Sequence, residues 1–160
     1  MHRGTTLFLK AAVVLIGLPI LAIYIFLVPG IGNFAAELYP EYTAIRIWIW
    51  IDLYATAIPF YLALYQSFRL LIHIERRRAF SDLAVQALKK IKYCGAAVGG
   101  LFAIGMPLYY MMAERDDAPG IIVIGLVIIF ASWVIAVFAA VLQKLLQEAI
   151  AIQLENELTV

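Results

Sequence analysis

One acidic residue lies inside an otherwise apolar stretch of this chain, and it is the first candidate for chemistry. Asp52 follows a run of mainly aromatic and aliphatic residues, 45–51, and precedes Thr56 by four positions. Positions four apart share one face of a helix, so Asp52 and Thr56 form a polar pair. Because a carboxyl group within a membrane span marks a functional site by default, this pair is our first candidate binding site.

The polar pair belongs to a longer stripe. Pro59, Ala63 and Gln66 follow Asp52 and Thr56 at helical spacing, and large aromatic side chains lie roughly opposite. Helices in lipid pack through small and polar residues, so we expect this face to point into the protein. We predict a structural role for Asp52, with cation binding or proton relay as the alternative.

The second candidate binding site is the basic triplet Arg76, Arg77 and Arg78. It lies within residues 69–92, a segment that holds seven of the chain's twelve Lys and Arg residues. Basic residues beside a membrane attract anionic lipid at about 1 kcal/mol each. We therefore expect the triplet to bind anionic lipid headgroups and predict no direct contact with nucleic acid. The nearby His73 is expected to be a solvated residue at a helix end.

Few other residues could support catalysis or metal binding. Cys94 is the only cysteine, so no intramolecular disulfide forms, and His2 and His73 are the only histidines. No glycine-rich phosphate loop and no histidine–carboxylate metal spacing occurs. The sequence therefore predicts no metal, no cofactor and no enzymatic activity.

Composition determines which elements must position these residues. The chain is 65% hydrophobic and 14% charged, against about 45–50% and about 25% in a soluble domain. We predict a single four-helix transmembrane domain over residues 1–160. The predicted spans are about 9–28, 45–68, 93–112 and 121–142, with a connector at 69–92 and, because of its Pro and Gly residues, a loop at 29–43.

The placement of basic residues predicts the orientation. Segments rich in Lys and Arg stay on the cytoplasmic side of a membrane. With both termini and the connector inside, only Arg46 and Arg115 of the twelve basic residues lie outside. The predicted fold class is therefore an all-α polytopic membrane protein, with two helical hairpins and both termini in the cytoplasm.

Small residues at intervals of four predict how the later helices pack. The third span has Gly95, Gly99 and Ala103, and the fourth has Ser132, Ala136 and Ala140. Such stripes let two helices approach closely. We favour a contact within the chain over a contact between two copies.

Two amphipathic segments are expected to emerge in the cytoplasm, where an apolar face must be buried against something. One starts at Ser81 and the other follows Gln143; their apolar positions are Leu83, Ala87 and Ile91, and Leu145, Ala149 and Ile152. They could cover each other or bind a partner helix. We favour a regulatory or scaffolding protein that presents these helices to a partner; the alternative is a small transporter or channel subunit that uses Asp52.

Three groups of residues carry a family resemblance. They are Pro59-Phe60-Tyr61, Ala79-Phe80-Ser81 with the segment 87–91, and the ending 155–160. In these residues and in the order of its segments, the chain resembles a family of small bacterial four-helix membrane proteins, domain of unknown function 2975. The resemblance implies a multi-pass protein of the bacterial inner membrane with no assigned activity. It also implies a possible cytoplasmic regulatory partner, because members look like partners of small helix-turn-helix regulators.

Overall fold

The protein is built from four long helices. The computed structural model describes residues 3–76 and 80–159, and the helices are α1 (Arg3–Leu38), α2 (Ile45–Glu75), α3 (Asp82–Asp116) and α4 (Gly120–Thr159). All four are long and apolar enough to cross a membrane, which needs about 20 apolar residues. The predicted all-α, four-helix fold is confirmed.

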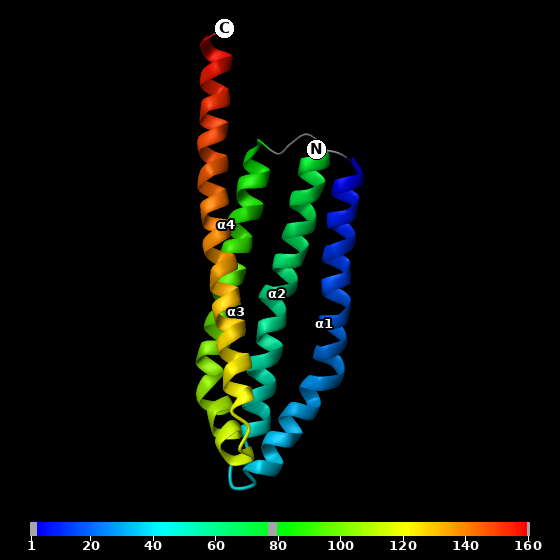
Figure 1. The fold of residues 1–160 in the computed structure, drawn as a ribbon, viewed down its shortest axis with the longest axis vertical. Coiled ribbons are helices and arrows are strands. Elements are labelled where there is room, and N and C mark those ends of the chain that lie inside the picture. The colour runs from blue at the N-terminus through cyan, green and yellow to red at the C-terminus, as the bar shows by residue number, and fades with distance from the viewer. Residues whose placement is uncertain (1–2, 77–79, 160) are drawn as a thin grey trace.

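The helices form two hairpins that pack side by side. Both termini lie at the same end of the molecule as the C-terminal end of α2 and the N-terminal end of α3 (Figure 1). Contacts follow the chain order: α1 packs on α2, α2 on α3, and α3 on α4. Among the described residues, α1 and α4 make no contact, so the helices form an open row with α1 and α4 at its edges.

Local signals explain where α3 begins and ends. Ser81 is extended and its hydroxyl accepts a hydrogen bond from the Ala84 amide at 3.4 Å, as an N-cap does. Asp82 in the first turn complements the positive helix end. At the other end, Asp117 adopts a left-handed conformation with φ 53° and its amide bonds to the Ala113 carbonyl. Such a residue is a common helix stop.

Helix α1 is longer than the sequence predicted. The expected loop over residues 29–43 is wrong for its first part, because α1 continues to Leu38 and only residues 39–44 connect it to α2. Pro19 and Pro29 both lie inside α1, which bends toward α2 in its lower part (Figure 1). Proline removes one helix hydrogen bond and produces a bend of this kind without ending the helix.

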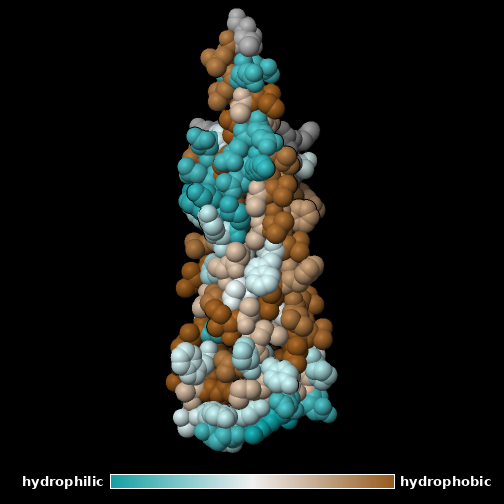
Figure 2. Space-filling view, turned by 90° about the vertical axis from the view of Figure 1, so that its left-hand side faces the viewer, coloured by the Kyte–Doolittle hydropathy of each residue, from teal (hydrophilic) through white to brown (hydrophobic). Residues whose placement is uncertain are grey.

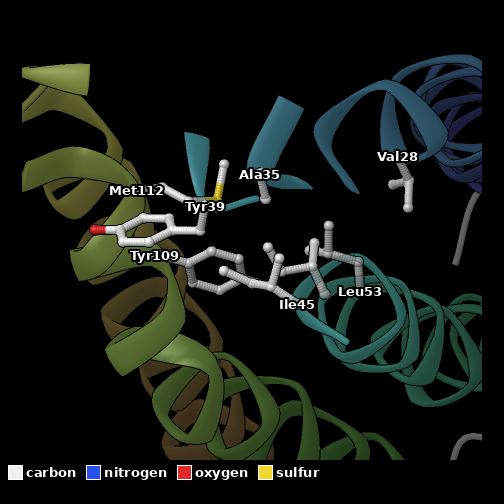
Figure 3. Close-up of a cluster of buried hydrophobic side chains, with 8 residues drawn as sticks. Val28, Ala35, Tyr39, Ile45, Leu53, Tyr109 and Met112 are labelled. Atoms are coloured by element: carbon white, nitrogen blue, oxygen red, sulfur yellow. The ribbon is translucent and has the colours of Figure 1, made fainter. Parts of the chain in front are cut away.

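The bend brings the last turns of α1 into the core. A buried cluster at this end of the molecule joins α1, the following loop, α2 and α3, and Figure 3 draws its side chains. Its members are Val28, Ala35, Tyr39, Ile45, Ile49, Leu53, Tyr109 and Met112. Ala35 and Ile49 are fully buried. Packing against this cluster is the reason residues 29–38 stay helical.

The outer surface is mainly apolar between two polar zones. On the face drawn in Figure 2, an apolar middle zone separates a polar lower end from a polar patch higher up. Large apolar side chains such as Phe26, Ile58, Phe130 and Phe138 are more than 60% exposed. A soluble monomer rarely exposes so much apolar surface, whereas lipid covers it at no cost.

The seam between α3 and α4 uses the predicted small residues. A Cβ added at Gly95 would lie 3.0 Å from the Ser132 carbonyl oxygen and 3.3 Å from the Ala136 Cβ. A Cβ at Gly99 would overlap the Trp133 indole. The predicted contact within the chain is therefore present: both stripes meet, and their backbones approach closely.

Candidate functional site

Asp52 lies at the interface between α2 and α3. Its residue surface is only 9% exposed, as the stripe pattern predicted. The Tyr109 hydroxyl donates a 2.6 Å hydrogen bond to its Oδ2 atom. Gly105, one helical turn before Tyr109, makes room for this carboxyl group, because a Cβ there would overlap it. The bond from Tyr109 and the space at Gly105 therefore hold the Asp52 carboxyl group between α2 and α3.

Thr56 connects the same face of α2 to α1. It is fully buried, and its hydroxyl donates to the Leu53 carbonyl at 2.6 Å. A threonine hydroxyl has one hydrogen, so the Tyr24 hydroxyl donates the 2.7 Å bond that joins it to Thr56. We call Tyr24, Asp52, Thr56 and Tyr109 the polar cluster. It links α1, α2 and α3 through side chains.

Two further tyrosines of α2 bond to the backbone of α1. The Tyr54 hydroxyl donates to the Tyr24 carbonyl at 3.1 Å, and the Tyr61 hydroxyl donates to the Gly17 carbonyl at 2.9 Å. Tyr61 and Tyr24 also pack ring to ring at 6.2 Å between centroids. Aromatic side chains of α2 thus contact α1 as Thr56 does, while Asp52 contacts α3.

The polar cluster is a set of satisfied groups. Each hydroxyl has an acceptor, and the Asp52 carboxyl group has a donor. A hollow of about 530 Å³ opens beside the first loop and another of about 330 Å³ lies between α1 and α2. Asp52 and Thr56 line neither hollow. The arrangement therefore works as a set of interhelical hydrogen bonds.

Around the second candidate site, the structure describes only part of the basic triplet. Arg76 is exposed at the end of α2, while Arg77 and Arg78 lie outside the described residues. The expectation for His73 is wrong, because this side chain is only 7% exposed. Its predicted solvation assumed that α2 projects alone, whereas the N-terminal part of α3 and the start of α1 run beside it (Figure 1).

At the opposite end of the molecule, Arg115 ties the first loop to α3. Its guanidinium group donates to the Leu38 carbonyl at 2.8 Å, pairs with Glu41 at 2.9 Å, and lies 4.1 Å from the Tyr39 ring centroid. The Tyr39 hydroxyl donates to the Met111 carbonyl at 2.6 Å. A hydrogen bond from its own backbone amide and the contact with Arg115 lower the pKa of Glu41.

In the connector part of α3 the predicted apolar stripe is partly covered within the chain, because Ala87 is buried and Ile91 is half-buried, whereas Leu83 is exposed. Ala84, Val85, Ala87 and Leu88 are all less than 9% exposed, while Leu83 is 42% exposed. Lys92 donates to the Gln143 side chain at 3.1 Å, which joins α3 to α4. This stripe is therefore less exposed than the end of α4.

The end of α4 is different. We call Ala151–Leu158 the α4 tip, and every residue in it is exposed. Ile152, Leu154 and Leu158 are 59%, 55% and 88% exposed. The tip extends past the ends of the other three helices (Figure 1).

Sequence reasoning missed the partners of the polar pair, Tyr24 and Tyr109. The available signal was that a tyrosine hydroxyl inside a membrane span must find a hydrogen-bond acceptor. The chain has nine tyrosines, so the rule does not identify the pairs. In the part of the chain that the structure describes, no three His, Cys, Asp or Glu residues are grouped to hold a metal.

Four spanning helices in two hairpins, joined by buried polar contacts, define an integral membrane protein. The chain belongs to the family described as "Protein of unknown function (DUF2975)", whose profile matches residues 30–160. A relative from Bacillus subtilis (strain 168), the "Uncharacterized membrane protein YoaS", is 64% identical over 160 residues, the full length of both chains. No solved structure matches the chain. The predicted family and the class of membrane protein are therefore confirmed.

Proposed function

We propose that this protein is a regulatory or scaffolding component of the bacterial cytoplasmic membrane, which holds a cytoplasmic protein at the membrane through the α4 tip. The proposed role is non-enzymatic and uses no cofactor. The observation that carries it is the length and exposure of α4. Its 40 residues extend about 60 Å at 1.5 Å per residue, about twice the thickness of the hydrocarbon core.

The distribution of charge supports a cytoplasmic location for the tip. Of the ten Lys and Arg residues in the described ranges 3–76 and 80–159, only Arg46 and Arg115 belong to the end formed by the two short loops. The other eight belong to the end at which α1 begins and α4 ends, and an excess of basic residues marks the cytoplasmic side. The tip extends from that basic end.

Exposed basic residues at the same end support binding to anionic lipid. Arg76, Lys89, Lys90 and Lys144 are all exposed. Each such residue contributes about 1 kcal/mol of attraction to an anionic membrane surface. In this proposal the lipid contact holds the helix ends at the interface, and the tip stands clear of it.

Partial burial of the connector makes the α4 tip the better candidate for the partner contact. Two cytoplasmic helices were candidates for a partner, but Ala84, Val85, Ala87 and Leu88 already pack inside the protein. The tip has no such cover. The partner contact is therefore assigned to α4 alone.

The second candidate function is transport of a proton or cation through Asp52. The observation that favours it is the burial of a carboxyl group inside a spanning helix. Against it stands the geometry of the polar cluster, in which the Asp52 carboxyl group accepts from Tyr109 and lines neither surface hollow. A permeation path needs a hydrated route to the acid, so we rank this function second.

Removal of the tip tests the proposal. Cells producing the full chain and cells producing a chain without residues 153–160 are separated into membrane and soluble fractions, and the proteins in each are quantified by mass spectrometry. We expect one cytoplasmic protein to move from the membrane fraction to the soluble fraction on truncation. The truncated chain should remain in the membrane at an unchanged level, because the tip residues are exposed.

The control is a chain in which Gln153 and Asn156 are both changed to Ser, which keeps the length of the tip and its apolar residues. This variant should retain the partner at the membrane. If truncation moves no protein out of the membrane fraction, the proposed function is wrong.

A further inference from the structure

The α4 tip carries a defined face. At 100° per residue, Ala151, Leu154 and Leu158 fall within about 60° of each other. Spacings of three and four residues are those of a helix that binds in a groove. All three residues are exposed in the structure. Closer to the membrane the same side of α4 carries polar residues, Gln143, Lys144 and Gln147, so the apolar face is separate from the lipid-facing surface.

Acidic residues border this face on both sides. Glu148 and Glu155 follow one edge and Glu157 follows the other. All three are exposed. From Leu145 to the end of the chain these three glutamates are the only charged side chains, with no Lys or Arg. The tip is thus an apolar stripe between negative edges.

The charge excludes two occupants that would otherwise fit an apolar stripe. In a second copy packed in parallel through this face, Glu155 and Glu157 of both copies would lie along one seam, and like charges there are destabilising. An anionic membrane surface would repel the same three glutamates. Neither self-association nor return to the bilayer therefore covers the face.

The described basic residues at the connector end of α3 do not cover it either. Lys89, Lys90 and Lys92 lie on α3, and Lys92 bonds to Gln143, eight residues before the tip begins at Ala151. The whole tip is exposed, including Leu158 at 88%. Because the described tip residues are exposed, their negative edges suit a positively charged surface on another molecule.

We propose that the partner of the α4 tip is a cytoplasmic protein with an apolar groove rimmed by Lys and Arg. The groove takes up Ala151, Leu154 and Leu158, and its basic rim pairs with Glu155 and Glu157. This inference rests on the proposed function and adds the chemistry of the partner surface. Burial of the apolar side chains provides the affinity, while the charged rim determines the specificity for the partner.

Site-specific cross-linking in intact cells tests the inference. A photoreactive phenylalanine replaces Leu158, at the end of the apolar face, in the full-length chain. In a matched control it replaces Gln153, which lies more than 90° away from that face. We expect a cross-link to one cytoplasmic protein that is at least 10-fold stronger from position 158 than from position 153. Mass spectrometry should map the cross-link to an apolar segment flanked by Lys or Arg.

Charge reversal provides the decisive step. Changing Glu155 and Glu157 to Lys in the Leu158 probe should weaken the cross-link at least 10-fold. Changing Asp116 and Glu114 to Lys, at the far end of the molecule, should leave it unchanged. Reversing the flanking Lys or Arg residues of the captured protein to Glu should restore the cross-link to the reversed tip. The level of each variant in the membrane fraction is measured alongside.

Three results would overturn the inference: a cross-link between two copies of this chain, a cross-link to lipid alone, or a protein cross-link that ignores both charge reversals. The last result is compatible with the proposed function if truncation of the tip still releases that protein. If truncation releases nothing, the proposed function fails independently of the charge experiment.

Discussion

At the scale of single residues, the contact between Asp52 and Tyr109 joins the two halves of the molecule. Asp52 belongs to the first hairpin and Tyr109 to the second, and their 2.6 Å hydrogen bond is buried. In lipid an unmatched polar group costs several kcal/mol, since no water can replace the lost partner. The bond therefore favours one register of α2 against α3, with Gly105 providing the space.

The first prediction concerns the two partners of this bond. Asp52→Asn should change the free energy of unfolding by less than about 1 kcal/mol, because the amide oxygen still accepts from Tyr109. Tyr109→Phe removes the only described donor to Asp52 and should cost about 1–3 kcal/mol. Thermal unfolding of the protein in lipid nanodiscs measures both.

Tyr110→Phe is the matched control, because Tyr110 is 54% exposed and should tolerate the change. A proton or cation flux in vesicles that disappears in Asp52→Asn, at an unchanged unfolding temperature, would contradict the structural role and favour the transport alternative.

The second prediction concerns pH at the opposite end of the molecule. The pKa of Glu41 is lowered in the folded protein by its backbone hydrogen bond and by Arg115. Its contribution to stability is therefore present above the ordinary glutamate pKa of about 4.3 and is lost as the pH falls through the lower folded value. Glu41→Gln should unfold at a slightly lower temperature than the wild type at pH 7.

This difference in unfolding temperature should close when both proteins are melted at a pH below the folded pKa. Glu37→Gln provides the comparison, since Arg115 pairs with Glu41. A gap that stays constant from pH 7 to pH 3 would show that the Arg115 contact does not depend on the Glu41 charge.

Residue patterns predicted the burial of Asp52 but not its partner. The stripe from Asp52 to Gln66 is a local property of one helix, so its orientation could be read from spacing alone. Asp52 and Tyr109 are 57 positions apart in the sequence, so their pairing depends on the register between α2 and α3. Local spacing carries no information on that register. The same reason explains why His73 was expected in solvent and is buried.

At the scale of elements, the α3–α4 seam depends on which glycine faces the neighbouring helix. The third prediction compares two glycines. Gly95→Ala places a Cβ 3.0 Å from the Ser132 carbonyl, whereas Gly100→Ala meets nothing within 4 Å. Both changes gain the same helix propensity, so the difference between them isolates the packing. Gly95→Ala should be less stable than Gly100→Ala by about 1–3 kcal/mol, the usual cost of overpacking.

Thermal unfolding in nanodiscs also measures this difference. A Gly95→Ala variant as stable as Gly100→Ala would mean that α4 moves away without cost, and the seam would not be a specific contact.

The ends of the elements were harder to predict than their number. Pro29, Gly30 and Gly32 are strong breakers in water, and they predicted a loop from residue 29. In the structure Gly32 packs directly under the Trp50 indole, where a Cβ would overlap the ring. Ala35 three residues later is fully buried. Packing against α2 thus keeps residues 29–38 helical. The residue pattern within one helix carries no information on such packing.

At the scale of the whole molecule, the open row of helices produces two different ends. One end is tied together by Arg115, Glu41 and Tyr39. The other end holds the exposed lysines and the α4 tip. Composition predicted the four helices, because only lipid can cover 65% apolar residues in so short a chain. The partly buried connector and the exposed tip could not be distinguished by sequence, since both segments are amphipathic.

The account depends most directly on the side of the membrane that the α4 tip faces. The fourth prediction tests it with single cysteines at two exposed positions, Gln153 in the tip and Asp116 at the opposite end, in a chain in which Cys94 is changed to Ala. A membrane-impermeant maleimide is added to intact cells, and again after permeabilisation. Asp116→Cys should be labelled in intact cells, and Gln153→Cys only after permeabilisation. Labelling of Gln153→Cys from outside intact cells would contradict the orientation and, with it, the proposed binding of a cytoplasmic partner.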